Sequence, residues 1–99
     1  MDRGLTTFQQ RCLRALEQHL GARDLTPSFE NVEPDRPAVS GGRYLKASVT
    51  LSDSTLDLYI YEDEAGFSYR GAWQICERQD YPSDAALIEA LIGELEAAT

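Results

Sequence analysis

Apolar and polar residues alternate over residues 44–51 and again over residues 56–61, and this alternation limits the fold more than any other feature. Successive side chains of an extended strand point to opposite faces of a sheet, so a period of two gathers one apolar set on one face. The apolar set consists of Leu45, Ala47, Val49, Leu51, Leu56, Leu58 and Ile60. The pattern therefore predicts two strands that each turn one face toward a core.

Short turn signals connect these strands to each other and to the next β-segment of the chain. Residues 52–55 (Ser-Asp-Ser-Thr) and 63–66 (Asp-Glu-Ala-Gly) have compositions that are typical of turns. Residues 67–77 continue as β-structure, where Gly71 either turns a hairpin or marks a bulge in one long strand. Connections this short leave no room for a crossover, so we expect an antiparallel meander.

Two amphipathic segments flank the predicted strands. Thr6 and Gln9 have the spacing of a capping box and predict a helix over residues 6–20. Ser83 follows a proline and predicts the start of a second helix over residues 83–97. The apolar stripes of the two helices comprise Phe8, Cys12, Leu13, Leu16, Leu20, Leu87, Ile88, Leu91, Ile92 and Leu95.

A sheet with one apolar face needs a second layer to bury that face, and the two helices can supply it. We therefore expect a two-layer α+β sandwich: an N-terminal helix, an antiparallel meander of roughly three to five strands, and a C-terminal helix on the same sheet face. Residues 21–42 contain three prolines and a Gly-Gly pair, and they contain either a short strand near 28–33 or a functional loop. The length of 99 residues predicts a single domain over 1–99.

Acidic residues outnumber basic ones by seventeen to nine, which gives a net charge of −8. The excess lies in residues 43–99, with eleven acidic and four basic side chains. Such a surface repels nucleic acids and anionic membranes and attracts basic proteins, although solubility alone is a competing interpretation. No apolar run approaches the ~20 residues that span a bilayer, and residues 1–4 begin no apolar leader, so we expect a cytoplasmic protein.

Patterns that carry catalysis or bind metals are not found in the sequence. His19 is the only histidine, so it cannot complete a zinc set with Cys12 and Cys76, which we interpret as free thiols in the core. No glycine-rich phosphate loop is present, and Glu62-Asp63-Glu64 lacks the alternating ligands of a calcium loop. We therefore expect neither an enzyme nor a cofactor or metal site.

The sheet face opposite the core is the candidate binding surface. Tyrosine combines a large apolar area with one hydrogen-bonding tip, and carboxylates beside it speed the capture of a basic partner. The competing interpretation is that tyrosine simply suits an outward strand position. Tyr69 belongs to this surface if the register across Gly71 turns it outward. The candidate partner-binding residues are Tyr44, Asp57, Tyr59, Tyr61, Glu62 and Tyr69.

Trp73 is the only tryptophan of the chain and lies between Gly71 and Ile75. We expect its side chain to pack beneath a helix, and the alternative is an exposed anchor for a partner. Arg70 and Arg78 flank it in sequence and can pair with nearby acids.

One stretch near the C-terminus carries a resemblance to a known class of proteins. It consists of Gly71-Ala72-Trp73, then Glu77, then Asp80-Tyr81-Pro82-Ser83 leading into a Leu-Ile-Glu-Ala-Leu helix at 87–91. This pattern resembles the C-terminal half of small bacterial immunity-type proteins. The resemblance implies a non-catalytic acidic protein that binds and blocks a cognate toxin, and it transfers no individual binding residue.

The leading hypothesis is a non-enzymatic acidic protein that binds and inhibits a basic protein partner, either a toxin or an effector. A second hypothesis is a small acidic chaperone or adaptor. Type III secretion chaperones are similar in having an N-terminal helix, a meander and a later helix, but this chain is shorter and lacks their extra strands. A third is an inhibitor that mimics nucleic acid. The first hypothesis favours a monomer and the second a homodimer.

Overall fold

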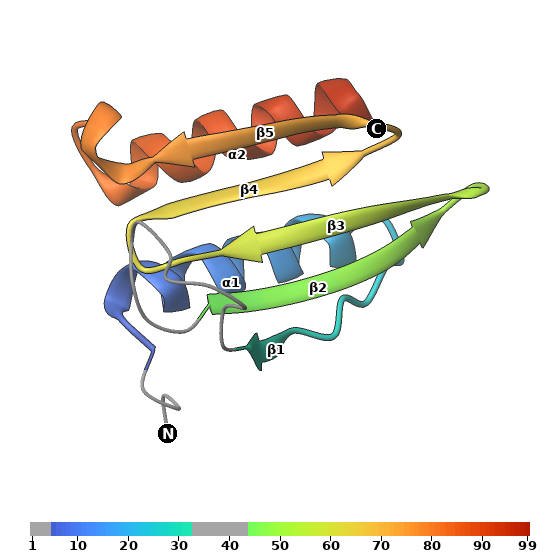
Figure 1. Ribbon diagram of the computed structural model, residues 1–99, viewed down its shortest axis with the longest axis horizontal. Helices are drawn as coiled ribbons and strands as arrows, with labels where there is room; N and C mark the ends of the chain where they lie inside the picture. Colours follow the sequence, from blue (N-terminus) through green and yellow to red (C-terminus); the bar gives the residue numbers. More distant parts are fainter. Residues whose placement is uncertain (1–4, 33–43) are drawn as a thin grey trace.

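A computed structural model describes residues 5–32 and 44–99, and this part of the chain forms two α-helices and one five-stranded antiparallel sheet (Figure 1). The strands follow one another in the sheet in the order β1-β2-β3-β4-β5, which is a meander. The predicted two-layer α+β arrangement with a helix at each end is therefore confirmed. The elements are α1 (Thr7–Gly21), β1 (Glu30–Val32), β2 (Tyr44–Leu51), β3 (Ser54–Ile60), β4 (Glu64–Tyr69), β5 (Ala72–Glu77), the 3₁₀ turn η1 (Arg78–Asp80) and α2 (Asp84–Ala98).

Both helices begin where the sequence predicts a cap. The Thr6 hydroxyl accepts a hydrogen bond from the Gln9 backbone N–H at 3.1 Å, and the Gln9 side chain accepts one from the Thr6 N–H at 3.0 Å. The Ser83 hydroxyl accepts a hydrogen bond from the backbone N–H of Ala86 at 3.1 Å. No helix in the described ranges is long and apolar enough to cross a membrane.

One hydrophobic cluster lies between the helices and the inner face of the sheet. The alternating apolar residues of β2 and β3 lie in this cluster, where all are buried except Leu51, which is partly buried, and both cysteines are buried free thiols. Cross-strand pairs hold the register, with Ala47 opposite Leu58 and Leu58 opposite Phe67. The largest fully buried side chains are Phe8, Leu16, Leu20, Leu45, Leu56, Leu58, Ile60, Leu87, Leu91 and Leu95.

The described part of the region predicted to be irregular, residues 21–32, contains one short strand. Glu30–Val32 forms β1 and pairs with β2 through Glu30 opposite Lys46, within the range where a strand is one of the two expectations. Residues 33–42 of that region lie outside the described residues, as does the polar start at residues 1–4.

Gly71 turns a hairpin rather than marking a bulge. Arg70 and Gly71 have φ angles of 52° and 82°, and Tyr69 pairs directly with Ala72. Positive φ at both central residues is the signature of a two-residue type I′ turn, whose twist matches that of the strands it joins. The turn fixes which side chains of β5 point inward.

This register makes two sequence predictions wrong. Trp73 does not pack beneath a helix, because it pairs with Ser68 on the face away from the helices and is 69% exposed. Tyr69 does not share that face, because it lies opposite Leu56 on the inner side and is 7% exposed. Tyr69 points inward because β4 pairs with β3 in this register, and the closing pair Tyr69–Ala72 of the turn then places Trp73 on the outer side.

Asp84 joins three elements at one end of the core. Its carboxylate is 8% exposed and accepts hydrogen bonds from Arg78 Nε at 2.9 Å and from Arg11 Nη1 at 3.3 Å. The arginines come from η1 and α1, and Asp84 opens α2. A carboxylate in the first turn of a helix also interacts favourably with the helix dipole.

We expect Asp84→Ala to lower the free energy of unfolding by about 1–3 kcal/mol, because two charge-assisted hydrogen bonds are lost. The loss is no larger because both arginines are partly exposed and water solvates them when the carboxylate is removed. Chemical denaturation measures this value directly. Glu89→Ala on the exposed side of the same helix is the matched control and should change it by less than about 0.5 kcal/mol. An equal effect of the two substitutions would contradict a structural role for the Asp84 ion pairs.

Candidate partner-binding face

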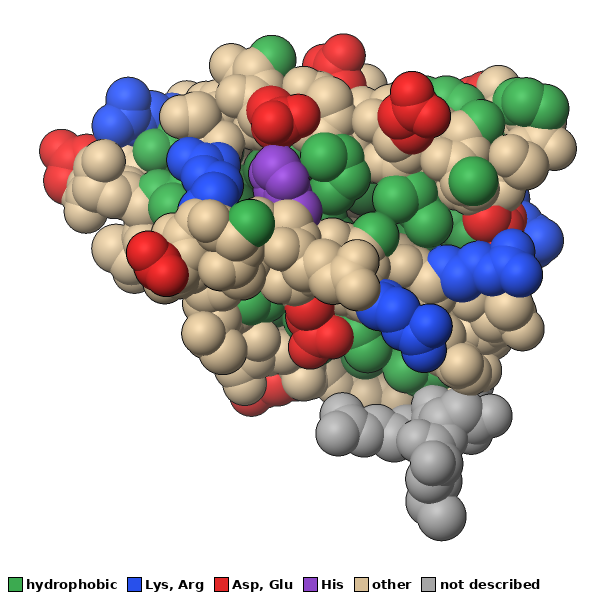
Figure 2. Space-filling view, turned by 180° about the vertical axis from the view of Figure 1, so that it is seen from behind, with side chains coloured by type: hydrophobic (Ala, Val, Ile, Leu, Met, Phe, Trp, Pro, Cys, Tyr) green, Lys and Arg blue, Asp and Glu red, His purple; other side chains and the backbone are tan. Residues whose placement is uncertain are grey.

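The sheet has one face that no described helix covers, and we call it the outer face. In Figure 1 the strands lie in front of both helices, so the view looks onto this face. Figure 2 shows the opposite side, where charged side chains lie among the apolar ones. The outer face comprises Tyr44, Lys46, Ser48, Asp57, Tyr59, Tyr61, Glu64, Gly66, Ser68, Trp73, Ile75 and Glu77.

Three of the predicted tyrosines form one aromatic cluster on the outer face. The rings of Tyr44 and Tyr61 stack with centroids 4.5 Å apart and planes 11° apart. The Tyr59 ring lies 6.5 Å from that of Tyr44, and the Lys46 ammonium lies 5.8 Å from the Tyr59 centroid. Stacking and the cation restrain these rings, so the cluster is a preorganised apolar surface.

The two predicted acids have different surroundings. Asp57 lies on the outer face between Ser48 and Ser68, and its carboxylate accepts a hydrogen bond from the Ser48 hydroxyl at 2.6 Å. Glu62 lies in the turn after β3 and is half-buried. Tyr69 is the one predicted site residue that the structure places on the inner face.

A second apolar group extends the outer face toward the edge of the sheet. Trp73 and Ile75 project from β5 and are the two large hydrophobic side chains that stay exposed among the described residues. Exposed apolar groups that gather on one side of a small protein usually mark a contact surface. Sequence reasoning missed Ile75 as a site residue and named Trp73 only as an alternative, as an exposed anchor for a partner.

Acidic side chains gather at one end of the outer face. Glu64 and Glu77 are direct cross-strand partners on β4 and β5, and Asp63 precedes Glu64 in the turn. Burial, followed by the charges of Asp63 and Glu77, raises the pKa of the Glu64 carboxyl above its ordinary value. Among the described residues, none forms an ion pair with Glu64 or Glu77.

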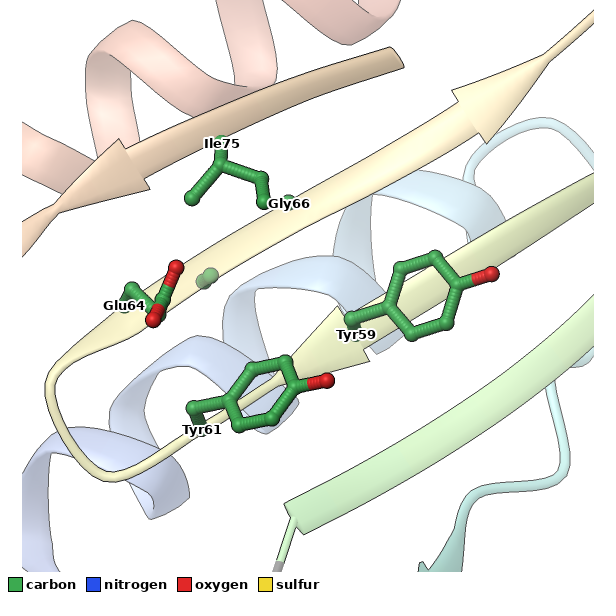
Figure 3. Close-up of a pocket in the computed structure, with 6 residues that line it drawn as sticks. Tyr59, Tyr61, Glu64, Gly66 and Ile75 are labelled. Atoms are coloured by element: carbon green, nitrogen blue, oxygen red, sulfur yellow. The ribbon is translucent and has the colours of Figure 1, made fainter. Parts of the chain in front are cut away.

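A hollow of about 180 Å³ lies between the tyrosines, the β5 apolar group and the acids (Figure 3). We call it the Gly66 hollow, and it is lined by Tyr59, Tyr61, Glu64, Ala65, Gly66 and Ile75. A Cβ at Gly66 would collide with the Gln74 carbonyl oxygen and lie 3.0 Å from Ile75 Cγ1. Glycine is therefore required for the close approach of β4 and β5 and leaves the hollow open.

We expect Glu64→Gln to raise the free energy of unfolding at neutral pH by a few tenths of a kcal/mol, since a like-charged cross-strand pair is relieved and the site is partly solvated. A carboxyl with a raised pKa in the folded state favours folding while it is protonated, and that contribution is lost as the pH rises through the raised pKa. The advantage of Glu64→Gln should therefore vanish below about pH 4.

Denaturation curves at neutral pH and below about pH 4 measure the difference in stability between Glu64→Gln and the wild type. Glu89→Gln is the control for the same charge change. A lower stability of Glu64→Gln at neutral pH would contradict the unfavourable ionisation of this carboxyl.

Two further features of the described residues concern metal binding and thiol chemistry. Within the described residues no group of three or more His, Cys, Asp or Glu side chains is arranged to hold a metal ion. Burial, and then the charges of Asp84 and Cys76, raise the pKa of the Cys12 thiol to about 12, so the reactive thiolate is scarce at neutral pH.

Comparisons with family models, with curated proteins and with solved structures each found no match to this chain. The function is therefore argued from the geometry of the outer face.

Proposed function

We propose that this protein is a non-enzymatic inhibitor that binds a basic protein partner, a toxin or an effector, through its outer face. The observation that carries the proposal is that Trp73 and Ile75 are exposed on the same face as the Tyr44–Tyr59–Tyr61 cluster. Tryptophan and tyrosine dominate the energetics of protein interfaces, because they bury a large area at a small entropic cost. The C-terminal third resembles immunity-type proteins, and we place the role in the cytoplasm.

The charge of the chain favours a basic partner. The net charge is −8, and Glu64, Glu77 and Asp57 lie on the outer face itself. Acidic groups around an apolar centre raise the association rate for a cationic surface and disfavour anionic competitors. Inhibition then follows from occlusion, since a partner seated on the sheet has that part of its own surface covered.

Capture from a lysate of the source organism by the immobilised protein tests the proposal. The wild type should retain a basic protein, and Trp73→Ala combined with Tyr59→Ala should lose it. Hot-spot truncations cost about 2 kcal/mol or more, which corresponds to an affinity loss of about 30-fold. Glu89→Ala on the helix side is the matched control and should retain the partner.

Retention of the same protein by the double variant, or its loss from the control, would contradict binding through the outer face. Sedimentation of the protein alone measures its oligomeric state, which separates the inhibitor, expected to be a monomer, from the chaperone-like alternative, expected to be a homodimer. A dimer that dissociates on Trp73→Ala would assign the outer face to a second copy of this chain instead of a basic partner.

A further inference from the structure

We infer that the Gly66 hollow receives one arginine side chain of the partner, with the guanidinium directed at Glu64. The inference rests on the proposed function and names the group that the outer face recognises. The hollow, the carboxylate in its wall and the tyrosine rings beside it are three separate features of the described residues that all suit this one group.

The shape of the hollow suits a single long side chain. Its volume of about 180 Å³ leaves room for about six water molecules. Gly66 forms the floor, Ile75 closes the side toward β5, and Tyr59 and Tyr61 close the side toward β3 (Figure 3). These walls are mainly apolar, so they match the three methylene groups of an arginine side chain better than a polar ligand.

The polar end of the hollow suits a cation. Glu64 is the one carboxylate among the described lining residues, and Glu77 lies directly across from it on β5. No lysine or arginine is among the described residues that line the hollow. A guanidinium that enters would relieve the repulsion between these carboxylates, the same repulsion that helps to raise the pKa of Glu64.

The tyrosine rings favour arginine over lysine. Guanidinium is planar and weakly hydrated, and it stacks on an aromatic ring while donating two parallel hydrogen bonds to a carboxylate. The fold already places one cation against this cluster, since the Lys46 ammonium lies 5.8 Å from the Tyr59 centroid. Lys46 belongs to β2, whereas the hollow lies toward β4 and β5, so the two positions are separate.

Titration of isotope-labelled protein with N-acetyl-arginine N-methylamide, followed by amide NMR, tests the inference. We expect saturable shifts at Gly66 and Ile75 with a dissociation constant in about the millimolar range, as for a single small group. The matched citrulline compound has nearly the same shape but a neutral urea, and it should bind about tenfold more weakly. The lysine compound should also bind more weakly than arginine.

Glu64→Gln should weaken arginine binding about tenfold, and Glu89→Gln, which removes the same charge from α2, should leave it unchanged. Equal binding of citrulline, equal or tighter binding of lysine, or unchanged binding to Glu64→Gln would each overturn the inference. If these results came with partner capture that still depended on Trp73 and Tyr59, the inference would fail and the proposed function would stand. Loss of that dependence would instead remove the proposed function.

Discussion

Leu58→Ala is expected to lower the free energy of unfolding by about 2–5 kcal/mol, whereas Tyr59→Ala at the next position should lower it by about 1 kcal/mol or less. The two residues are neighbours on β3 but point to opposite faces. Leu58 is 1% exposed and lies between Ala47 and Phe67, so its truncation leaves a cavity in the core. Tyr59 lies on the outer face, where its truncation removes only contacts at the surface.

Chemical denaturation of the wild type and the two variants measures both values under one set of conditions. The ratio matters more than either value, because the variants share a strand and its intrinsic propensities. If Tyr59→Ala cost as much as Leu58→Ala, the tyrosine would belong to a second core and the outer face would not be free for a partner.

Gly66→Val should destabilise the protein by about 1–3 kcal/mol, although valine is a far better strand residue than glycine. Propensity alone predicts a gain, because glycine weakens a strand interior. The structure predicts a loss, because any Cβ at this position meets the Gln74 carbonyl oxygen and the Ile75 side chain. The sign of the change therefore separates the two arguments.

Ser68→Val is the matched control, since Ser68 lies two residues along the same strand on the same face. It should be neutral or slightly stabilising in the same denaturation experiment. A stabilising effect of Gly66→Val would contradict the close approach of β4 and β5 that forms the hollow. Gly66→Val should also abolish the arginine-dependent NMR shifts.

The layers of the fold were predictable because they depend on local periodicity. The period of two in residues 44–60 decides which side chains of β2 and β3 face the core, and the caps at Thr6 and Ser83 decide where the helices begin. Each signal is contained in a few neighbouring residues. The predicted placement of Tyr44, Asp57 and Tyr59 followed from the same alternation and needed no knowledge of the tertiary structure.

The positions of Tyr69 and Trp73 were predicted wrongly because they depend on the registers of β4 with β3 and of β5 with β4, which the sequence does not settle. Tyr69 faces inward because the register of β3 with β4 places it opposite Leu56, and Trp73 faces outward because the two-residue turn pairs Tyr69 with Ala72. A hydrophobic tryptophan also favours burial as a general expectation, and here the register leaves it at the surface. The general preference of tryptophan for burial therefore predicted the wrong face for Trp73, because the turn at Arg70-Gly71 decides it.

The Gly66 hollow could not be predicted because its lining comes from three strands. The pairing of Gly66 with Ile75 and of Glu64 with Glu77 depends on the register between β4 and β5, which is set by the turn. A glycine in a strand indicates either a bulge or a close approach, and the sequence does not tell these apart.

Quenching of Trp73 fluorescence by acrylamide tests the central claim most directly, because this residue is the only tryptophan of the chain. At 69% exposure its emission and quenching should be close to those of an indole in water, and dilution should leave both unchanged. A short-wavelength emission with little quenching in the dilute protein would show that the outer face is covered, and it would contradict the account.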